Sequence, residues 1–523
     1  MEKLEEWFKI KKYPHIGKPI TIKDYNWVRN YVNNAQKIRT HSFLPLIHKT
    51  IVKRKFRSDK ETNLKNPSGK RQRKKYDPKI RDTFFASHLD SIIFSKYNYV
   101  LTEKYEKYIK DKPFNESIVA YRKIPLIPGK KGNKCNIDFA KSVFDFIKSN
   151  NNEKLTVIVA DISSFFDNLN HKILKKKWAE VLQMKTLPPD HYNIFKAITN
   201  IKYIESQQLF ESYDKTMIVE RGVANSSSRK EYVRKKINDS KFFKEKNAVS
   251  YCDKDEFLKN NLKLIISKKN ERGIPQGSPI SATLANIYML DFDSEIFNYI
   301  GNTGGFYQRY CDDLIIVINR KFEDEILKTL NDTIKSVDLP LAPEKTKLYH
   351  FENVNLVFTG FAIDLVTKEV ISNKPLEYLG FSFDGKRVLI KTPGFSKFYR
   401  SMKGAFNRAT YSAIFGQNAD NRLFKKRLYK RFTFRGAKRK LLYRQSKENP
   451  NIYEKTKKYD WGNYLSYVYK ANETMKTINE NDDVKRQARK LWHRFHKLII
   501  ESEQTIKNKT PGGSRVGKGE FHP

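Results

Sequence analysis

The sequence predicts an α+β protein, and two kinds of hydrophobic pattern support this fold class. Residues 155–160 (LTVIVA) and 314–318 (LIIVI) are short uninterrupted apolar runs, which are typical of strands buried on both faces. Residues 82–113 and 484–500 instead carry apolar and aromatic side chains at helical spacing, and Pro113 marks the end of the first helix. The chain therefore combines buried strands with helices that pack one face against a core.

Length and composition predict a folded chain with several subdomains and reduced cysteines. The 523 residues exceed what one hydrophobic core usually supports. Hydrophobic residues make up 39% of the chain and include 35 Phe and 29 Tyr, which is enough to build such cores. The three cysteines, Cys135, Cys252 and Cys311, are far apart in sequence, so we expect neither a zinc site nor disulfides.

A large surplus of positive charge predicts a polyanionic partner. Lys and Arg total 102 against 58 Asp and Glu, which leaves a net charge of +44. Phosphates that bind such a surface release counterions, so nucleic acid is the leading candidate and an anionic membrane the second. No run of 18 apolar residues exists, and the first residues (MEKLEEWFKI) lack the pattern of a signal peptide. We therefore expect no membrane span and a cytoplasmic protein.

Three polar segments of the sequence lead to different predictions. Residues 53–81 are strongly basic and predict an exposed loop or hairpin lying against a polyanion, or simply a solvated charged loop. Residues 205–271 are charged and irregular, as expected of an insertion. Residues 395–470 interleave basic with aromatic side chains, which suits RNA through phosphate contacts and base stacking. The alternative for that last segment is a helical region with core aromatics and solvated lysines.

Three carboxylates are expected to meet at the ends of two buried strands. Asp161 ends the first apolar run, and the adjacent Asp312 and Asp313 precede the second. Like charges that are buried close together repel one another, which is costly unless cations compensate. Hard oxygen ligands suit Mg²⁺ or Mn²⁺, and two such ions can act together in nucleotidyl transfer. The alternative is an ordinary polar turn.

A loop rich in Gly and Pro lies between these two strands in the sequence. Residues 270–289 (NERGIPQGSPISATLANIYM) alternate Gly273, Pro275, Gly277 and Pro279 and then continue with a helical pattern. Glycine permits close approach to the backbone, and proline fixes the turn. Such a loop suits a nucleotide or a template strand lying against the main chain, although a plain junction between loop and helix gives the same pattern.

Five motifs occur in the order that reverse transcriptases show: DISSFFD, GIPQGSP, YCDD, PEKTKLY and LEYLGFSF. The sequence resembles that family across about residues 120–385. The resemblance implies a right-hand polymerase fold with fingers, palm and thumb, followed by a helical basic C-terminal region. It also implies an RNA-directed DNA polymerase that makes cDNA from RNA and deoxynucleoside triphosphates with two Mg²⁺ ions, for which Mn²⁺ is an alternative.

The resemblance also implies a division of the chain. Residues 1–119 form an N-terminal helical and basic region that begins the fingers, and residues 120–385 form the fingers and palm with an insertion at 205–271. Residues 386–510 form a helical thumb that binds RNA, and residues 511–523 form a flexible tail.

Roles for individual residues follow from the matching motif positions. Asp161 and Asp312 are the main metal ligands, with Asp313 and the neighbouring Ile162 beside them. Lys345 matches the lysine that protonates the leaving pyrophosphate. The bulky ring of Phe166 matches the residue that leaves no room for a ribose 2′-hydroxyl.

Further residues are expected to hold the nucleotide and the primer. The nucleotide contacts are Arg122, Lys123, Ser164, Phe165, Phe166 and Gln276, with Lys130 and Lys131 as rivals of the first two. The turn that grips the primer consists of Tyr378, Leu379, Gly380 and Phe381.

Within the family, the chain resembles bacterial enzymes. The FFDNLNH segment is similar to retron and group II intron enzymes, whereas no RNase H cluster and no Cys/His endonuclease module is found. The insertion and the basic C-terminal region resemble the defence-associated class with its abortive-infection relatives, and type 9 is the candidate within it. That class acts against phages, works with a dedicated non-coding RNA, and includes homo-oligomers.

Two other functions stay open at this point. The first is a DNA synthase that makes an untemplated homopolymer, or one that starts from a protein hydroxyl. The C-terminal tyrosines offered for such priming are Tyr411, Tyr443, Tyr453, Tyr459 and Tyr464. The second is an RNA-binding scaffold or maturase without catalysis, which the presence of all three carboxylates disfavours.

Overall fold

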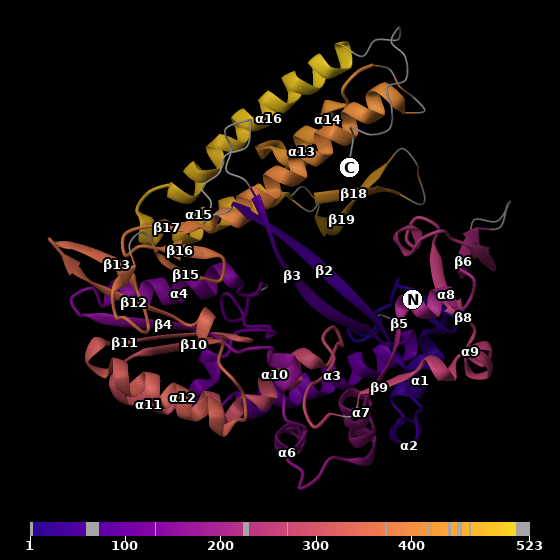
Figure 1. Cartoon of the computed structure of the whole chain (residues 1–523), viewed down its shortest axis with the longest axis horizontal. Coiled ribbons are helices and arrows are strands. Elements are labelled where there is room, and N and C mark those ends of the chain that lie inside the picture. Colours follow the sequence, from indigo (N-terminus) through magenta and orange to yellow (C-terminus); the bar gives the residue numbers. More distant parts are fainter. Residues whose placement is uncertain are drawn as a thin grey trace.

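The computed structural model describes most of the chain. The described residues are 4–58, 73–130, 132–222, 230–268, 270–371, 374–416, 419, 421–437, 441–446, 449, 452–459 and 462–508. Helices account for 49% and strands for 22% of the residues, which confirms the predicted α+β class. Figure 1 shows a central sheet with a long hairpin on one side and a group of helices above it.

The central sheet has six strands in the order β10-β11-β4-β12-β13-β14, and every pair is antiparallel. Both predicted strands lie in its middle, as β4 (Leu155–Asp161) and β11 (Asp313–Asn319). The other strands are β10 (Phe306–Tyr310), β12 (Lys347–Val354), β13 (Val357–Ile363) and β14 (Val370–Ile371).

Alternate side chains of the central sheet enter two different cores. Ile158 and Leu314 belong to a core with α3 (His88–Ile109), α10 (Ser281–Tyr288), α11 (Leu290–Thr303) and α12 (Glu323–Ser336). Val157 and Ile315 point to the other face, which α4 (Asn136–Ser149) covers. Because both faces are buried, the strands are apolar throughout rather than alternating.

The N-terminal part carries a long antiparallel hairpin of β2 (Leu46–Ser58) and β3 (Arg73–Phe85). It joins β5 (Ile201–Glu205) and β9 (Ile266–Lys268) in a separate sheet. The hairpin predicted for residues 53–81 is thus present in the described part of that segment, whereas its tip, residues 59–72, lies outside the described residues. The helices α1 (Tyr25–Val32) and α2 (Ala35–Arg39) precede it, and α3 follows.

The segment 205–271 is more regular than its polar sequence predicted. It contains α8 (Ser206–Glu211), β6 (Thr216–Gly222), β7 (Lys230–Lys236), β8 (Ala248–Cys252) and α9 (Lys254–Asn260). The segment is therefore not irregular, and its assignment as an insertion stays a prediction. The reason is that β8 pairs with β1 (His15–Ile16) from the far N-terminus, so a distant segment completes a small core of its own.

Above the central sheet stand the C-terminal helices, α13 (Thr392–Phe415), α14 (Lys425–Phe432), α15 (Tyr464–Asn479) and α16 (Asp483–Lys507). The helix predicted at 484–500 is α16. A small sheet of β15 (Leu376–Tyr378), β16 (Phe381–Phe383) and β17 (Val388–Ile390) forms their base. A hairpin of β18 (Leu441–Gln445) and β19 (Tyr453–Tyr459) projects from them.

Three further sequence predictions concern membrane spans, the C-terminal tail and the domain boundaries. None of the described helices has the length and apolar character that a membrane span requires. The tail predicted at residues 511–523 lies outside the described residues. The predicted domain boundaries remain predictions, because the contacts described above do not define them.

Burial of His15 ties the N-terminal strand to the rest of the fold. Its Nε2 donates to the carbonyl of Phe85 (3.0 Å), and its Nδ1 accepts from the amide of Ile16 (2.8 Å), so the ring is satisfied in its neutral form. Burial lowers the pKa of His15 to about 4. A second proton would have to sit on Nδ1, facing the amide of Ile16.

Acidification is therefore expected to destabilise the protein through His15. Below pH 6.5 the unfolded chain takes up a proton that the folded chain refuses until about pH 4, so the free energy of unfolding falls across this window, by roughly 3 kcal/mol in all. Urea unfolding at several pH values measures the loss. His15→Gln removes the titrating ring, and an unchanged pH slope in this variant would contradict the assignment.

Candidate active site

The three predicted carboxylates meet at one edge of the central sheet. Asp161 is the last residue of β4 and Asp313 the first of β11, and the two are direct partners in the strand register. Asp312 lies in the turn between β10 and β11, where its carbonyl accepts from the amide of Ile162 at 3.1 Å. The pairing of two neighbouring strands thus brings together carboxylates that are far apart in the sequence.

Electrostatics show that these carboxylates crowd one another. Loss of surrounding water, together with repulsion from Asp312 and Asp161, raises the pKa of Asp313 to about 6, although its side chain keeps an exposed edge. Lys345 donates a hydrogen bond to Asp161, and this bond raises the pKa of the ammonium group. Asp161 is therefore paired with Lys345, whereas Asp313 is repelled by the neighbouring carboxylates.

The donor set fits hard divalent cations. Carboxylate oxygens are the ligands that Mg²⁺ and Mn²⁺ prefer, and the repulsion felt by Asp313 is what a bound cation would relieve. Within the described ranges, no three His, Cys, Asp or Glu side chains already form a closed cluster that could hold an ion. The side chains of Asp161, Asp312 and Asp313 would therefore have to turn inward, and Lys345 would have to leave Asp161.

A buried ion pair supports the turn that carries Asp312. Arg309 binds Asp293 of α11 through two hydrogen bonds of 2.7 and 2.6 Å, and both side chains are fully buried. The same guanidinium donates to the carbonyl of Cys311 at 3.0 Å, and Cys311 adopts a left-handed backbone conformation with φ 63°. Tyr307 donates a further hydrogen bond to Asp293 at 2.6 Å.

Sequence reasoning missed this pair. The available signal was an arginine inside a buried strand, two residues before the turn, because a charge in that position requires a partner. Burial opposes the charged form of Arg309, but Asp293 more than offsets it and raises the pKa of the guanidinium. The ion pair therefore stays charged.

Breaking the pair is expected to destabilise the protein strongly. Asp293→Asn would leave Arg309 charged and uncompensated in the core, at a cost of about 3–5 kcal/mol in the free energy of unfolding. Urea unfolding measures the loss. The control is Asp324→Asn, since that side chain is 96% exposed and should change stability by less than about 0.5 kcal/mol. Equal losses of unfolding free energy in the two variants would show that the ion pair of Arg309 and Asp293 does not stabilise the protein.

A second residue near the turn was also missed. Residues 118–121 run beside β10, where Ile118 bridges to Arg309 and the amide of Val119 donates to the carbonyl of Arg309. This segment places Tyr121 next to the turn, and its hydroxyl donates to the Sγ of Cys311 at 3.3 Å. Half of the Tyr121 ring is exposed, and its φ of 63° is unusual for a tyrosine. An aromatic surface therefore borders the carboxylates.

Arg122 has a different place from the one predicted. Its guanidinium makes hydrogen bonds of 2.8 and 2.9 Å to Glu106 and others to Asn115 and Ile118, and its side chain is 8% exposed. The group that was expected to hold a triphosphate instead fixes residues 115–122 against α3. Lys123 is 77% exposed and pairs with Glu6, and Lys130 is exposed as well. Lys131 lies outside the described residues.

The Gly-rich loop lies against the segment that follows Asp161. The amide of Gly273 donates to the carbonyl of Leu169, and that of Ile274 to the carbonyl of Phe166, both at 2.8 Å. Gly273 has φ +94°, and a Cβ there would lie 2.8 Å from the carbonyl oxygen of Asp167. Only glycine fits, so the loop and the segment 165–171 can lie side by side.

The predicted nucleotide contacts gather around this junction. Phe166 is half-buried against Phe165, with ring centroids 5.5 Å apart. Ser164 is exposed and left-handed with φ 45°. Gln276 is half-buried, and its carbonyl accepts from the amide of Phe84 in β3. The structure thus brings these predicted residues to one side of the carboxylates.

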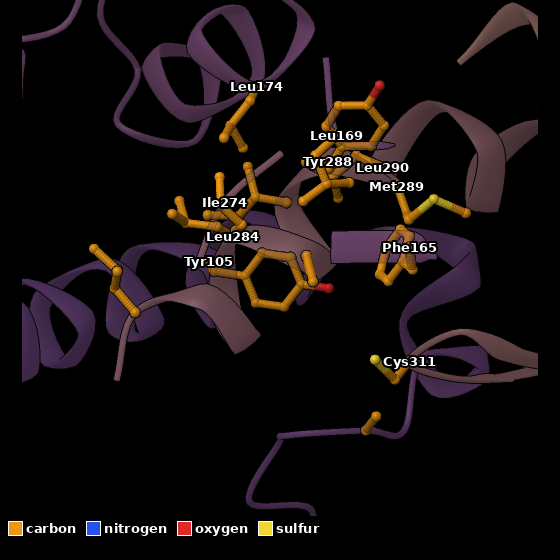
Figure 2. Packing of buried hydrophobic residues seen from close by; sticks show 14 of the residues in the cluster. Tyr105, Phe165, Leu169, Leu174, Ile274, Leu284, Tyr288, Met289, Leu290 and Cys311 are labelled. Atoms are coloured by element: carbon orange, nitrogen blue, oxygen red, sulfur yellow. The ribbon is translucent and has the colours of Figure 1, made fainter. Parts of the chain in front are cut away.

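One hydrophobic core holds the separate segments in register. Phe165, Ile274 and Cys311 come from three different parts of the chain, and all are buried in the core formed with α3 and α10. Figure 2 shows these residues in one cluster with Leu284 and Tyr288 of α10. These three segments with predicted site residues therefore have an apolar anchor in the same core, whereas Tyr378 and Phe381 of the predicted primer-gripping turn are buried in the core on the other face of the sheet.

The predicted primer-gripping turn is a tight hairpin beside the same edge. Leu379 and Gly380 both have positive φ, 41° and 92°, as in the two-residue turns that suit antiparallel strands. The hydroxyl of Tyr378 donates to Gln308 at 3.2 Å, and the carbonyl of Leu379 accepts from Asn136. Burial and then the nearby charge of Asp313 raise the pKa of Tyr378, which places it close to the carboxylates.

Comparison with protein families identifies part of the chain. Residues 234–383 match the family described as reverse transcriptase (RNA-dependent DNA polymerase). The chain contains a reverse transcriptase domain. The matched range includes Asp312, Asp313 and Lys345, whereas Asp161 precedes it. The matched range contains five of the six strands of the central sheet, β10 to β14. With the N-terminal hairpin and the C-terminal helices around it, the predicted right-hand polymerase fold is confirmed.

Similarity to individual proteins is weak. No curated protein matches the sequence. Telomerase from Candida albicans, solved with a fragment of telomeric RNA, is 12% identical at a TM-score of 0.36, and the match covers 92% of this chain and 68% of that one. Apo telomerase from Candida tropicalis, truncated from its C-terminal domain, is 16% identical at a TM-score of 0.30, with 68% and 60% covered. Sequence identities and TM-scores this low do not indicate a function.

Proposed function

We propose that this protein is an RNA-directed DNA polymerase that joins deoxynucleotides to a primer. The observation that carries the proposal is the convergence of Asp161, Asp312 and Asp313 at one sheet edge, with the last two inside the range that matches the reverse transcriptase family. Two divalent cations bound there would activate the attacking oxygen and stabilise the leaving one. The carboxylates supply the ligands, and Arg309 fixes the turn that presents two of them.

Lys345 is the proposed proton donor. In the free protein its ammonium is held by Asp161, within reach of the place where phosphates would lie. During nucleotidyl transfer the primer hydroxyl would give its proton to water, its oxygen would form the new bond to the α-phosphate, and the bond to pyrophosphate would break. A proton from Lys345 would then remove one negative charge from the leaving pyrophosphate. This step requires that Lys345 first exchange Asp161 for a phosphate oxygen.

The proposed nucleotide contacts follow from the junction around Gly273. Phe166 would exclude a 2′-hydroxyl, Gln276 would lie beside the sugar, and the main chain at Ser164 and Phe165 would face the triphosphate. Lys130 is exposed, and Lys123 would exchange its exposed partner Glu6 for a phosphate, whereas Arg122 is buried on Glu106 and is left out of the proposal. The turn from Tyr378 to Phe381 would support the primer.

The proposed setting is bacterial antiphage defence with an associated non-coding RNA as template, which rests on the sequence resemblance alone. Synthesis started from a protein hydroxyl is the second candidate. Tyr443 and Tyr453 support it, because both lie on the projecting β18–β19 hairpin and are more than half exposed. Tyr464 is a weaker primer candidate, since it packs on Phe398 with ring centroids 5.0 Å apart. Sequencing the DNA product separates a copied RNA from a homopolymer.

Loss of two carboxylates is expected to abolish synthesis. Asp312→Asn with Asp313→Asn removes the negative charge that the cations require, so incorporation of labelled deoxynucleotides should fall at least 10³-fold. Protein purified with its bound nucleic acid, Mg²⁺ and each deoxynucleotide are the assay components. Asp324→Asn, far more exposed, is the matched control and should retain activity. Synthesis by the double variant at the rate of the control would refute the proposal.

Phe166→Ala is expected to admit ribonucleotides. Removing the ring opens the space next to the sugar, so the preference for dNTP over rNTP should fall by about 10²-fold, while addition of deoxynucleotides continues. Competition between the two nucleotides in single-addition assays gives the ratio. Phe165→Leu is the matched variant, because Phe165 is buried in the core and should leave the preference unchanged. An unchanged ratio in Phe166→Ala would exclude its role.

A further inference from the structure

The C-terminal helices carry a pocket that the proposed polymerase site does not use. It encloses about 430 Å³ between α15, α16 and the turn after α14. Leu465 and Tyr469 of α15 form part of its lining, and Phe434 and Trp492 stand at its mouth. The rings of Phe434 and Trp492 are 52% and 38% exposed, with centroids 5.3 Å apart. The volume lies in the range of small-molecule sites.

Positive charge surrounds this aromatic pocket. Lys485, Arg486 and Arg489 line it together with His493, against a single carboxylate, that of Asp482. Asp482 already accepts a hydrogen bond from Asn472 at 2.8 Å. No carboxylate among the described residues lies within ion-pair distance of Arg489, so its charge is available to a ligand. An aromatic floor with a cationic rim suits a planar base that carries a phosphate.

The pocket faces away from the sheet edge that holds the carboxylates. Tyr467 of α15 bonds Asn136 of α4, which in turn holds the carbonyl of Leu379 in the primer-gripping turn. Leu465 and Tyr469 are two residues from Tyr467 on either side, and therefore about 200° away around the helix. A nucleic acid seated here would lie outside the polymerase site.

Trp492 also lines a second hollow of about 590 Å³ further along α16, together with His496, Lys497 and Ile500. One ring thus borders two neighbouring hollows on the same helix face. Such an arrangement accommodates successive bases of one strand. Arg489 lies at the first hollow, whereas Lys497 at the second pairs with Glu501, which also lines it. A duplex does not fit this description, because its bases stay stacked inside and present only edges and phosphates.

We propose that Phe434, Trp492 and Arg489 form a binding site for unpaired bases of an RNA, outside the polymerase site. The proposal rests on the proposed function for the identity of the polyanion as RNA. Base stacking on the two rings supplies affinity, and Arg489 contacts a flanking phosphate, whereas Arg486 already pairs with Asp483 at 3.5 Å. The site would hold a single-stranded part of the RNA while another part is copied.

The test measures RNA binding without synthesis. The protein carries Asp312→Asn and Asp313→Asn, so the result does not depend on whether the polymerase works. The probe is a short fluorescent RNA of mixed sequence that forms no helix, read by anisotropy at several salt concentrations. The same RNA with 4-thiouridine is photocrosslinked, and the attached peptides are identified by mass spectrometry.

Crosslinks are expected on peptides that contain Phe434 or Trp492. Trp492→Ala should lower the affinity roughly tenfold. Arg489→Ala should lower it as well and reduce the slope of log affinity against log salt by about one. Lys490→Ala is the matched control, because Lys490 is exposed on the same helix but does not line the pocket, and it should change affinity less than twofold.

Several outcomes would overturn the proposal. Equal effects of Arg489→Ala and Lys490→Ala would reduce the pocket to general surface charge, and this comparison does not depend on how Trp492→Ala folds. Crosslinks confined to the fingers and the central sheet would place the RNA elsewhere. Binding of free nucleotides but not of RNA would identify a different ligand.

Discussion

The buried ion pair between Arg309 and Asp293 links the core of this protein to its chemistry. Two charges are removed from water at considerable cost. Their mutual hydrogen bonds offset this cost, together with one that Tyr307 donates to Asp293 and one that Arg309 donates to Asn286. The guanidinium of Arg309 also donates a hydrogen bond to the carbonyl of Cys311. The backbone of the turn that presents two repelling carboxylates is thereby held in place by the protein itself, whereas the carboxylate side chains would still have to turn to hold cations.

Charge is balanced differently at each layer of the site. In the core, Arg309 and Asp293 neutralise one another, and Arg122 and Glu106 do the same at the edge of the fingers. At the surface of the sheet edge the balance is incomplete, because Lys345 pairs with Asp161 while Asp313 is left among like charges. This unbalanced layer is the part of the protein in which we propose that cations and phosphates bind. The surplus of +44 over the whole chain predicts a larger polyanionic partner on the same principle.

Hydrophobic anchoring explains how distant segments keep their relative positions. The turn at Cys311, the loop at Ile274 and the segment at Phe165 enter one core, and each exposes polar or aromatic groups immediately beside its anchor. Close packing of such a core resists small displacements, which is what a site built from several segments requires. Gly273 adds to this by allowing two backbones to touch where any side chain would separate them.

The sequence by itself determined the features that local pattern encodes. Uninterrupted apolar runs predicted β4 and β11, helical spacing predicted α3 and α16, and the order of motifs predicted the reverse transcriptase domain and the meeting of Asp161 with Asp313. Only the tertiary structure decided how charged and aromatic groups are used. The sequence predicted that Arg122 binds the nucleotide, but its side chain is buried against Glu106. The contacts of Tyr121, Asp293 and Trp492 could not be predicted, because their partners lie elsewhere in the chain. The polar segment 205–271 became regular because strand β1 completes its sheet. Local propensity is read from neighbours in sequence, whereas the pairing of a charge depends on which residues folding brings next to it.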